Sequence, residues 1–160
     1  PSMWLGVRSN AYVAVRAGIR HSLFTVQPEA DAVAMDEYLK SLQPIPSPHL
    51  VNGKPSPAAE RGEKLFADEK VGCAECHKGK LLTDLKPHEV GTRGKFDKPM
   101  DKFDTPTLIE LWRSGPYLHD GSAVTMRDIL TVRNKDDEHG TTSHLTQGQL
   151  EDLVAYLISL

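Results

Sequence analysis

The sequence predicts an all-α protein in which a few helices are joined by long loops. Two observations carry this prediction. Residues 58–160 open and close with segments that combine helix start signals with helical spacing of apolar residues. Between these segments the chain is rich in Gly, Pro and Asp, and hardly any stretch alternates with the period of a strand. Loops of this length need something other than an ordinary core to order them.

Composition sets the size of the protein and excludes several classes. The chain has 160 residues, of which 39% are hydrophobic, and a formal net charge of −3. This suffices for one domain, or for one domain and part of another. Basic residues form no cluster, so we expect no nucleic-acid partner. No apolar run approaches the roughly 18 residues of a membrane helix, and the opening PSMWLG resembles no signal peptide.

Residues 1–43 contain one predicted helix, followed by a proline-rich linker at 44–57. Pro28 suits the first turn of this helix, and Glu29 and Asp31 suit its positive end. Five prolines and an Asn-Gly pair make the linker an extended strap. The apolar contacts of the helix are expected from Val33, Met35, Tyr38, Leu39 and Leu42.

Residues 58–160 form the second predicted unit. Its first helix follows Ser56, an N-cap, and Pro57 at position N1. Its last helix follows Thr146, with Gln149 as the capping-box partner. Two further helical stretches are predicted at 105–114 and 124–132. The apolar face of the last helix consists of Leu150, Leu153, Val154 and Leu157.

An interior glycine and a faint repeat add detail to these helices. Gly62 costs about 1 kcal/mol in a helix, so we expect it to permit a close crossing near Leu153 and Tyr156. The segment DEYLKSL at 36–42 resembles VAYLISL at 154–160, and His21 and His139 each lie 17 residues before the tyrosine of these segments. Residues 1–43 are therefore interpreted as the helical tail of a preceding domain built like the second one.

The two cysteines of the chain lie in CAECH, and this C-x-x-C-H pattern is that of c-type haem attachment. Two thiols in one helical turn reach the two vinyl groups on one edge of a porphyrin, and the next residue lies over the iron. Cys73 and Cys76 would then form thioethers, and His77 the proximal iron bond. One covalent haem c is expected, and the porphyrin would help to order the long loops.

Three alternatives to haem remain. A zinc site needs about four ligands; His88 is one candidate, but a fourth ligand is not obvious. A thioredoxin-like redox pair expects a βαβ context, which the sequence lacks. The third alternative is a chance motif in a structural loop.

Beyond CAECH, four further segments carry a resemblance to a known family, in the same order. They are PHEVG (87–91), TPTLIELWRSGPYLHDG (105–121), TMRDIL (125–130) and VAYLISL (154–160). On these segments, residues 56–160 resemble the C-terminal haem domain of bacterial di-haem cytochrome c peroxidases. The resemblance implies a cytochrome c-like fold for this mono-haem unit. The peroxidases carry two CxxCH motifs, and this chain has one, so the resemblance by itself implies no peroxide site.

The resemblance also indicates a second axial ligand. The family has a methionine just before the last helix, and here the equivalent segment is HGTTSHL (139–145). His139 takes the ligand position, with Met100, Met126 and His144 as alternatives. Two histidines would lower the reduction potential relative to His/Met, because thioether sulfur favours ferrous iron.

Other residues are expected around the haem, each with an ordinary surface role as the alternative. Arg93, Trp112, Arg113 and Lys95 are candidates to meet the haem propionates, which need cationic or N–H partners. His119 lies at a family position and is expected to bond a neighbouring group, with His88 in a similar role. His21 would face a second haem only if another chain or segment carried one.

Electron transfer by one covalent haem is the leading functional prediction. Redox proteins would dock at an exposed haem edge near residues 73–77, and this kind of haem implies export to the periplasm. The alternative is the C-terminal part or a subunit of a di-haem peroxidase or oxidase whose substrate site is on another haem. An open sixth position would instead permit a single-haem peroxidase, and a colourless protein with zinc would indicate an interaction module.

Overall fold

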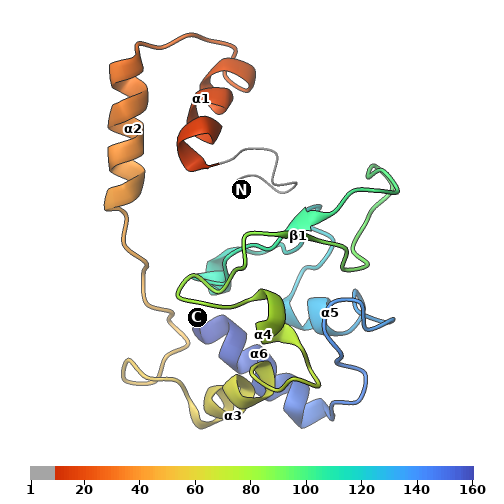
Figure 1. Cartoon of the computed structure of the whole chain (residues 1–160). Helices are drawn as coiled ribbons and strands as arrows, with labels where there is room; N and C mark the ends of the chain where they lie inside the picture. Colours follow the sequence, from red (N-terminus) through yellow and green to blue (C-terminus); the bar gives the residue numbers. More distant parts are fainter. Residues whose placement is uncertain (1–9) are drawn as a thin grey trace.

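The structure, a computed structural model, describes residues 10–160. Within this range it consists of helices joined by long loops, with one pair of two-residue strands (Figure 1). A helical hairpin lies at one end, and the other elements form a separate cluster. The elements are α1 (Ala11–His21), α2 (Glu29–Ser41), α3 (Pro57–Phe66), α4 (Cys73–Cys76), β1 (Pro87–His88), β2 (Phe103–Asp104), the 3₁₀ helix η1 (Leu111–Arg113), α5 (Met126–Leu130) and α6 (Gln147–Ser159).

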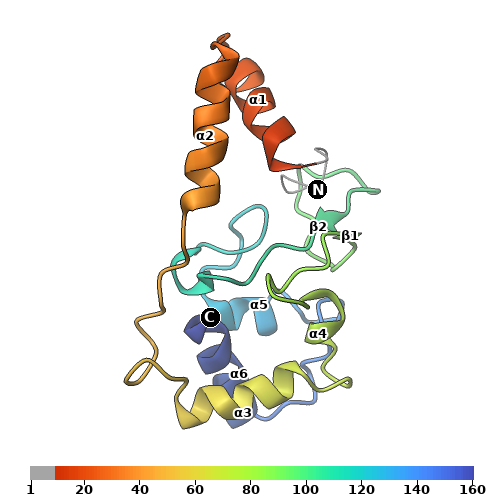
Figure 2. The same ribbon diagram turned by 60° about the vertical axis from the view of Figure 1, so that its left-hand side comes forward.

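The hairpin contains two helices where the sequence predicted one. Helix α2 is the predicted helix, and α1 begins after Asn10, whose side chain accepts a hydrogen bond from Val13 N at 3.0 Å. Arg16 of α1 joins the two helices through ion pairs with Glu29 and Asp36. Figures 1 and 2 show that the hairpin stands apart from α3 and α6.

The predicted apolar contacts of α2 are wrong within the described residues. Helix α2 packs against α1, and Ala32 is buried. The five predicted contact residues have between 42% and 65% of their surface exposed; they are Val33, Met35, Tyr38, Leu39 and Leu42.

The strap at 44–57 is bonded to the second unit. Ser47 is buried and donates from Oγ to the carbonyl of Ile158 at 2.6 Å. The amide of Ile45 donates to Glu110 Oε1 at 2.5 Å. The strap turns back on itself at Asn52-Gly53, where both residues have positive φ.

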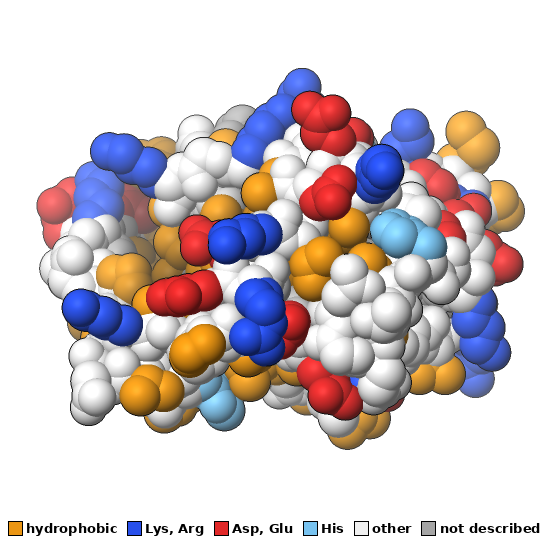
Figure 3. All heavy atoms as spheres, turned by 90° about the horizontal axis from the view of Figure 1, so that it is seen from below, with side chains coloured by type: hydrophobic (Ala, Val, Ile, Leu, Met, Phe, Trp, Pro, Cys, Tyr) orange, Lys and Arg blue, Asp and Glu red, His pale blue; other side chains and the backbone are white. Residues whose placement is uncertain are grey.

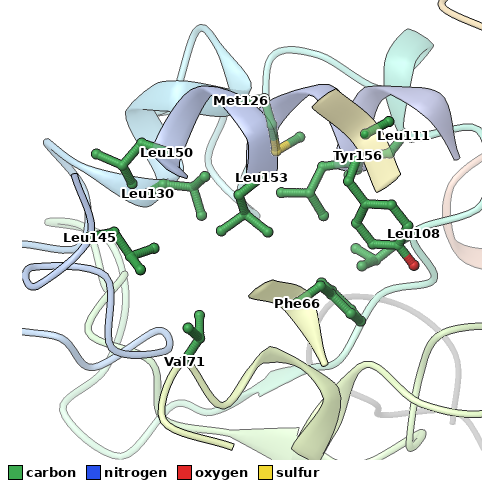
Figure 4. Packing of buried hydrophobic residues seen from close by; sticks show 12 residues of the cluster. Phe66, Val71, Leu108, Leu111, Met126, Leu130, Leu145, Leu150, Leu153 and Tyr156 are labelled. Carbon is green, nitrogen blue, oxygen red and sulfur yellow. The ribbon is translucent and has the colours of Figure 1, made fainter. Parts of the chain in front are cut away.

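Helices α3 and α6 cross closely and carry the core. The caps at Ser56 and Thr146 form as predicted. Gly62 lies under α6, where an added Cβ would come within 2.0 Å of the Asp152 carbonyl oxygen and 2.8 Å of Tyr156 Cβ. Tyr156 and Phe66 rings pack with centroids 5.2 Å apart. Figure 4 shows this core, which also contains Val71, Leu108, Leu111, Met126, Leu130, Leu145, Leu150, Leu153 and Leu157.

Three predicted helix bounds differ from the structure. The helix predicted at 105–114 is reduced to η1, because Glu110 adopts the left-handed conformation with φ 59°. The amide of Glu110 bonds Leu160 O at 3.1 Å, which ties this loop to the end of α6. The stretch 124–132 is helical only over α5, and the helix that the sequence predicts over AAERGEKLFADEK (58–70) ends at Phe66. None of the described helices has the length and apolar character to cross a membrane.

Candidate functional site

Helix α4 presents the two cysteines and His77 from a single turn. Gly72 precedes α4 with φ 78°, a left-handed conformation that glycine adopts without strain. The amide of His77 bonds the carbonyl of Cys73 at 3.0 Å, so His77 closes the turn. Cys73 and Cys76 are free thiols, both partly buried. The turn therefore has the arrangement that the C-x-x-C-H spacing predicts.

The pKa values of both thiols are shifted in the opposite direction to those of a reactive redox dithiol. Burial raises the pKa of Cys73 to about 11. Burial also raises the pKa of Cys76, and the negative charges of Asp84 and Glu75 add to this effect. Reactive dithiols have a lowered thiol pKa, so this environment argues against the thioredoxin-like alternative.

The His77 ring is oriented by a backbone carbonyl. Its Nδ1 lies 3.1 Å from Leu82 O, which accepts the hydrogen bond when Nδ1 carries the proton. Burial lowers the pKa of His77, so the ring is neutral near pH 7. A neutral imidazole that donates from Nδ1 leaves Nε2 with a free lone pair, and metal-ligating histidines commonly have such a partner.

His139 lies in a loop that Asn134 fixes at three points. The amide of His139 donates to Asn134 Oδ1 at 2.8 Å, and Asn134 Nδ2 donates to Gly140 O at 2.7 Å and to Thr142 Oγ1 at 2.9 Å. Gly140 is required here, since an added Cβ would lie 2.9 Å from Val71 O and 3.7 Å from Cys73 Sγ. The loop of His139 therefore packs directly against the cysteine segment.

Nδ1 of the His139 ring is buried and lacks a partner among the described residues. Burial and the neighbouring His77 lower the pKa of His139 to about 4. The ring is therefore neutral at physiological pH, as metal binding requires. An unsatisfied buried ring nitrogen costs free energy, and a bound group beside the ring would offset that cost.

The rings of His77 and His139 lie close together, at a separation that would suit two imidazoles holding one metal ion. Their centroids are 6.3 Å apart, and their planes differ by 38°. With a metal–nitrogen bond of about 2 Å and about 1.1–1.2 Å from nitrogen to ring centre, imidazoles on opposite sides of one ion have centres about 6.3 Å apart. With the thiols of α4 beside them, these residues fit an iron porphyrin.

The alternative sixth ligands lie elsewhere. Met100 is 86% exposed, and His144 is exposed. Met126 is 5% exposed and belongs to the hydrophobic core, where its sulfur points toward Leu153 (Figure 4). Of the four candidates, His139 has the ring that packs opposite His77.

The remaining predicted site residues have varied surroundings. Arg93 pairs with Glu89, and Arg113 pairs with Glu110. Lys95 lies over the Phe96 ring. Trp112 Nε1 is buried without a partner among the described residues.

His119 bonds a neighbouring group. Its Nε2 lies 2.8 Å from Asp97 Oδ2, and its ring stacks on Phe103 with centroids 3.7 Å apart. Asp97 also accepts from the amide of Gly94 at 2.6 Å. His119 thus ties the loop after residue 93 to β2.

Two features of the site were missed in the sequence. One is the set of hydrogen bonds by which Asn134 holds the backbone around His139. Nothing in the sequence marks an asparagine five residues before a histidine as such a partner. The other is Asp84, which lies 2.8 Å from His88 Nε2. Burial opposes its ionisation, but hydrogen bonds from His88, the Lys86 amide and Thr105 outweigh it and lower the pKa of Asp84 to about 2.

Comparison with known proteins agrees with this geometry. The family model described as Cytochrome c matches residues 59–160. The gamma subunit of hydrazine synthase from Kuenenia stuttgartiensis is 36% identical over 77% of this chain and 47% of that protein. A solved structure of Kuenenia stuttgartiensis hydrazine synthase superimposes with a TM-score of 0.79 and 31% identity, over 92% of this chain and 60% of that one.

Two other relatives are similar over shorter parts. The methylamine utilization protein MauG of Methylorubrum extorquens is 33% identical over 64% of this chain and 34% of that protein. The cytochrome-c peroxidase IdrP1 of Denitromonas iodatirespirans is 26% identical over 66% of this chain and 40% of that protein. The chain thus spans less than half the length of these curated relatives.

These matches confirm the cytochrome c-like, mostly helical fold and the resemblance on which the sequence prediction depended. A covalent c-type haem and a redox role follow from membership of this family. The chain belongs to the cytochrome c family, as a c-type cytochrome of the di-haem peroxidase superfamily.

Proposed function

We propose that this chain transfers electrons through one haem c, bonded to Cys73 and Cys76 and ligated by His77 and His139. The single observation that carries this proposal is the proximity of the His77 and His139 rings, whose centroids are 6.3 Å apart. When bound, the haem supplies an iron that accepts and releases one electron. With both His77 and His139 holding the iron, the site would leave no position open for a small substrate.

The chain's own residues tune and hold the site. Leu82 O fixes the orientation of His77 and raises the basicity of its ring. Asn134 holds the backbone on both sides of the His139 side chain. Two imidazole ligands favour ferric iron more than a His/Met pair does, so a reduction potential below that of His/Met cytochromes is expected. Trp112 Nε1 is proposed to donate to a propionate, with Arg93 at the polar rim of the same haem.

Redox proteins of the periplasm are the proposed partners, because this type of haem attachment belongs to exported compartments. Charges of both signs are mixed over the face shown in Figure 3, with hydrophobic side chains between them. Such a surface suits short-lived contacts better than tight binding to a strongly charged partner.

An absorption spectrum combined with intact mass tests the proposal. The chain is produced in the periplasm with haem maturation, and the pyridine haemochrome assay counts the haem. One covalent haem and low-spin iron at rest are expected. A colourless protein refutes haem attachment, whereas one covalent haem with high-spin iron refutes the paired histidines.

A second candidate function has a specific observation in its favour. Helices α2 and α6 are both 13 residues long, and they end in the matching segments DEYLKSL and VAYLISL. Tyr156 is 9% exposed because α3 covers it, whereas Tyr38 is 65% exposed. We propose that the hairpin is the tail of a second c-type unit, with His21 on the side of its haem, and that the assembled protein is a di-haem oxidoreductase.

Peroxide turnover by the chain alone tests whether this haem is itself catalytic. The chain alone is mixed with hydrogen peroxide and a reduced electron donor, and donor oxidation is followed optically. Electron transfer alone predicts turnover no faster than that of a denatured haem peptide. Faster turnover by the chain alone would contradict the closed iron site and favour an enzymatic role for this haem itself.

A further inference from the structure

The segment between α4 and β2, residues 78–102, carries an excess of positive charge. It contains seven basic and four acidic residues, a net charge of +3, whereas the whole chain has a net charge of −3. The rest of the chain therefore carries a net charge of −6. Because both signs are mixed along this segment, the sequence shows no basic cluster. The structure separates the two signs.

The four carboxylates of the segment are bonded within it. Each accepts a hydrogen bond from a backbone amide two or three residues away, at 2.6–3.2 Å: Asp84 from Lys86, Glu89 from Gly91, Asp97 from Gly94 and Asp101 from Lys98. Two of them also bond a histidine, and their side chains are only 5% exposed at Asp84 and 19% exposed at Asp97. These carboxylates therefore stabilise turns of the backbone.

The lysines of the segment are exposed and unpaired. Within the part of the chain that the structure describes, Lys40 of α2 forms an ion pair with Glu37, but no lysine of this segment forms one. An exposed ammonium without a carboxylate in its own chain is available to a carboxylate of another molecule. The six lysines are Lys78, Lys80, Lys86, Lys95, Lys98 and Lys102.

Large apolar side chains lie among these lysines in the sequence and are also exposed. Phe96 is 90% exposed and Met100 is 86% exposed, both in the loop before β2. Leu81 and Leu85, closer to α4, are 57% and 50% exposed. Aromatic residues and methionine are enriched in protein interfaces, where a polar rim surrounds an apolar centre. The segment therefore offers both parts of a docking surface.

This segment packs directly against the cysteine turn. His77 Nδ1 lies 3.1 Å from Leu82 O, and Cys76 Sγ lies within 4.8 Å of a ring nitrogen of His88. Figures 1 and 2 show the segment rising from α4 on the side away from α3. It therefore lies away from the face of mixed charge that Figure 3 shows from below.

We propose that residues 78–102 form a docking surface for an acidic protein. Carboxylates of that protein would meet the lysines, and Phe96 and Met100 would pack against its apolar side chains. That this protein is a redox partner rests on the proposed function. An acidic patch of limited size meets this segment alone, whereas an extended anionic membrane would also repel the net charge of −6 on the rest of the chain.

Binding of poly-L-glutamate to the haem-loaded chain tests the proposal. Titration calorimetry at pH 7 gives the affinity, which should fall as salt is added. Lys80→Gln combined with Lys98→Gln should weaken binding by roughly threefold to tenfold, because two exposed ion pairs are lost. Lys64→Gln combined with Lys135→Gln changes the net charge equally, at exposed lysines outside the segment, and should leave the affinity nearly unchanged.

Three results would overturn the proposal. They are no binding by the wild type, equal weakening by both double variants, and binding at physiological salt to vesicles of phosphatidylglycerol and phosphatidylcholine, which would replace the protein partner by a membrane. None of these measurements depends on electron transfer. The haem spectrum of the same sample reports separately on the proposed function, so the failure of one is distinguished from the failure of the other.

Discussion

Replacing Gly62 by alanine tests whether the close crossing of α3 and α6 holds the haem unit together. Alanine is favoured over glycine in a helix interior by about 1 kcal/mol. Against this, the new Cβ would lie 2.0 Å from the Asp152 carbonyl oxygen and 2.6 Å from its carbon. Ordinary contacts are about 3.5–4.0 Å, so the helices must separate by about 1.5 Å.

The separation would weaken packing along the whole α3–α6 contact, including the Phe66–Tyr156 ring pair. Overpacking of this kind typically costs about 1–3 kcal/mol and occasionally more. Because the obstacle is backbone, the upper part of that range applies. After the gain in helix propensity, we expect the free energy of unfolding to fall by about 2 kcal/mol.

Gly148→Ala is the matched control for this prediction. Gly148 lies in the first turn of α6, and a Cβ there would meet nothing within 4 Å. This variant should be as stable as the wild type or more stable, by up to about 1 kcal/mol. Guanidinium unfolding of the haem-loaded chains, followed by far-UV circular dichroism, gives both values. Gly62→Ala at or above wild-type stability would refute the close crossing.

The other predictions concern the site. His139→Ala should turn low-spin iron into high-spin iron that binds added imidazole, whereas His144→Ala should leave the spectrum unchanged; an unaltered His139→Ala spectrum would refute the ligand. Asn134→Asp keeps the acceptor for the His139 amide but loses both donors, so cyanide should displace His139 several-fold faster. An unchanged rate would count against a role of the Asn134 hydrogen bonds in holding His139. The pKa of Asp84 lies below its unfolded value, so its stabilising effect is present above about pH 4 and is lost as the pH falls toward 2. Asp84→Asn should reduce this loss in acid unfolding curves; equal curves would contradict it.

Local patterns predicted the parts of the fold that are governed by local rules. The caps at Ser56 and Thr146 and the apolar face of α6 depend on residues within one or two turns, and all three are present. Gly62 was also interpretable, because a glycine inside an amphipathic helix has an energetic cost that close packing can offset. The CAECH turn forms as its spacing predicts.

Segments held by distant partners were not predictable in this way. The stretch 105–114 has helical spacing, yet the left-handed Glu110 breaks it, and Glu110 bonds the strap and the chain end instead. Helix α1, by contrast, has local signals in the sequence, a capping residue and an amphipathic pattern, and could have been predicted. The partners of Asp84 become visible only when the loop after α4 is placed in space.

The loop that carries His139 (residues 134–144) bears on the choice between electron transfer and catalysis. The sequence suggested that haem would order the long loops, but this loop also has a network of its own. Asn134 bonds both sides of the His139 side chain, and Asp137 accepts hydrogen bonds from the amides of Thr142 and Ser143 at 2.8 Å and 3.0 Å. A ligand on a loop that is fixed in this way loses little conformational entropy when it binds iron, and it is slow to leave. An iron site that must open for a substrate would need a more mobile ligand loop. The hydrogen bonds of Asn134 and Asp137 therefore favour an iron that keeps both histidine ligands through its redox cycle.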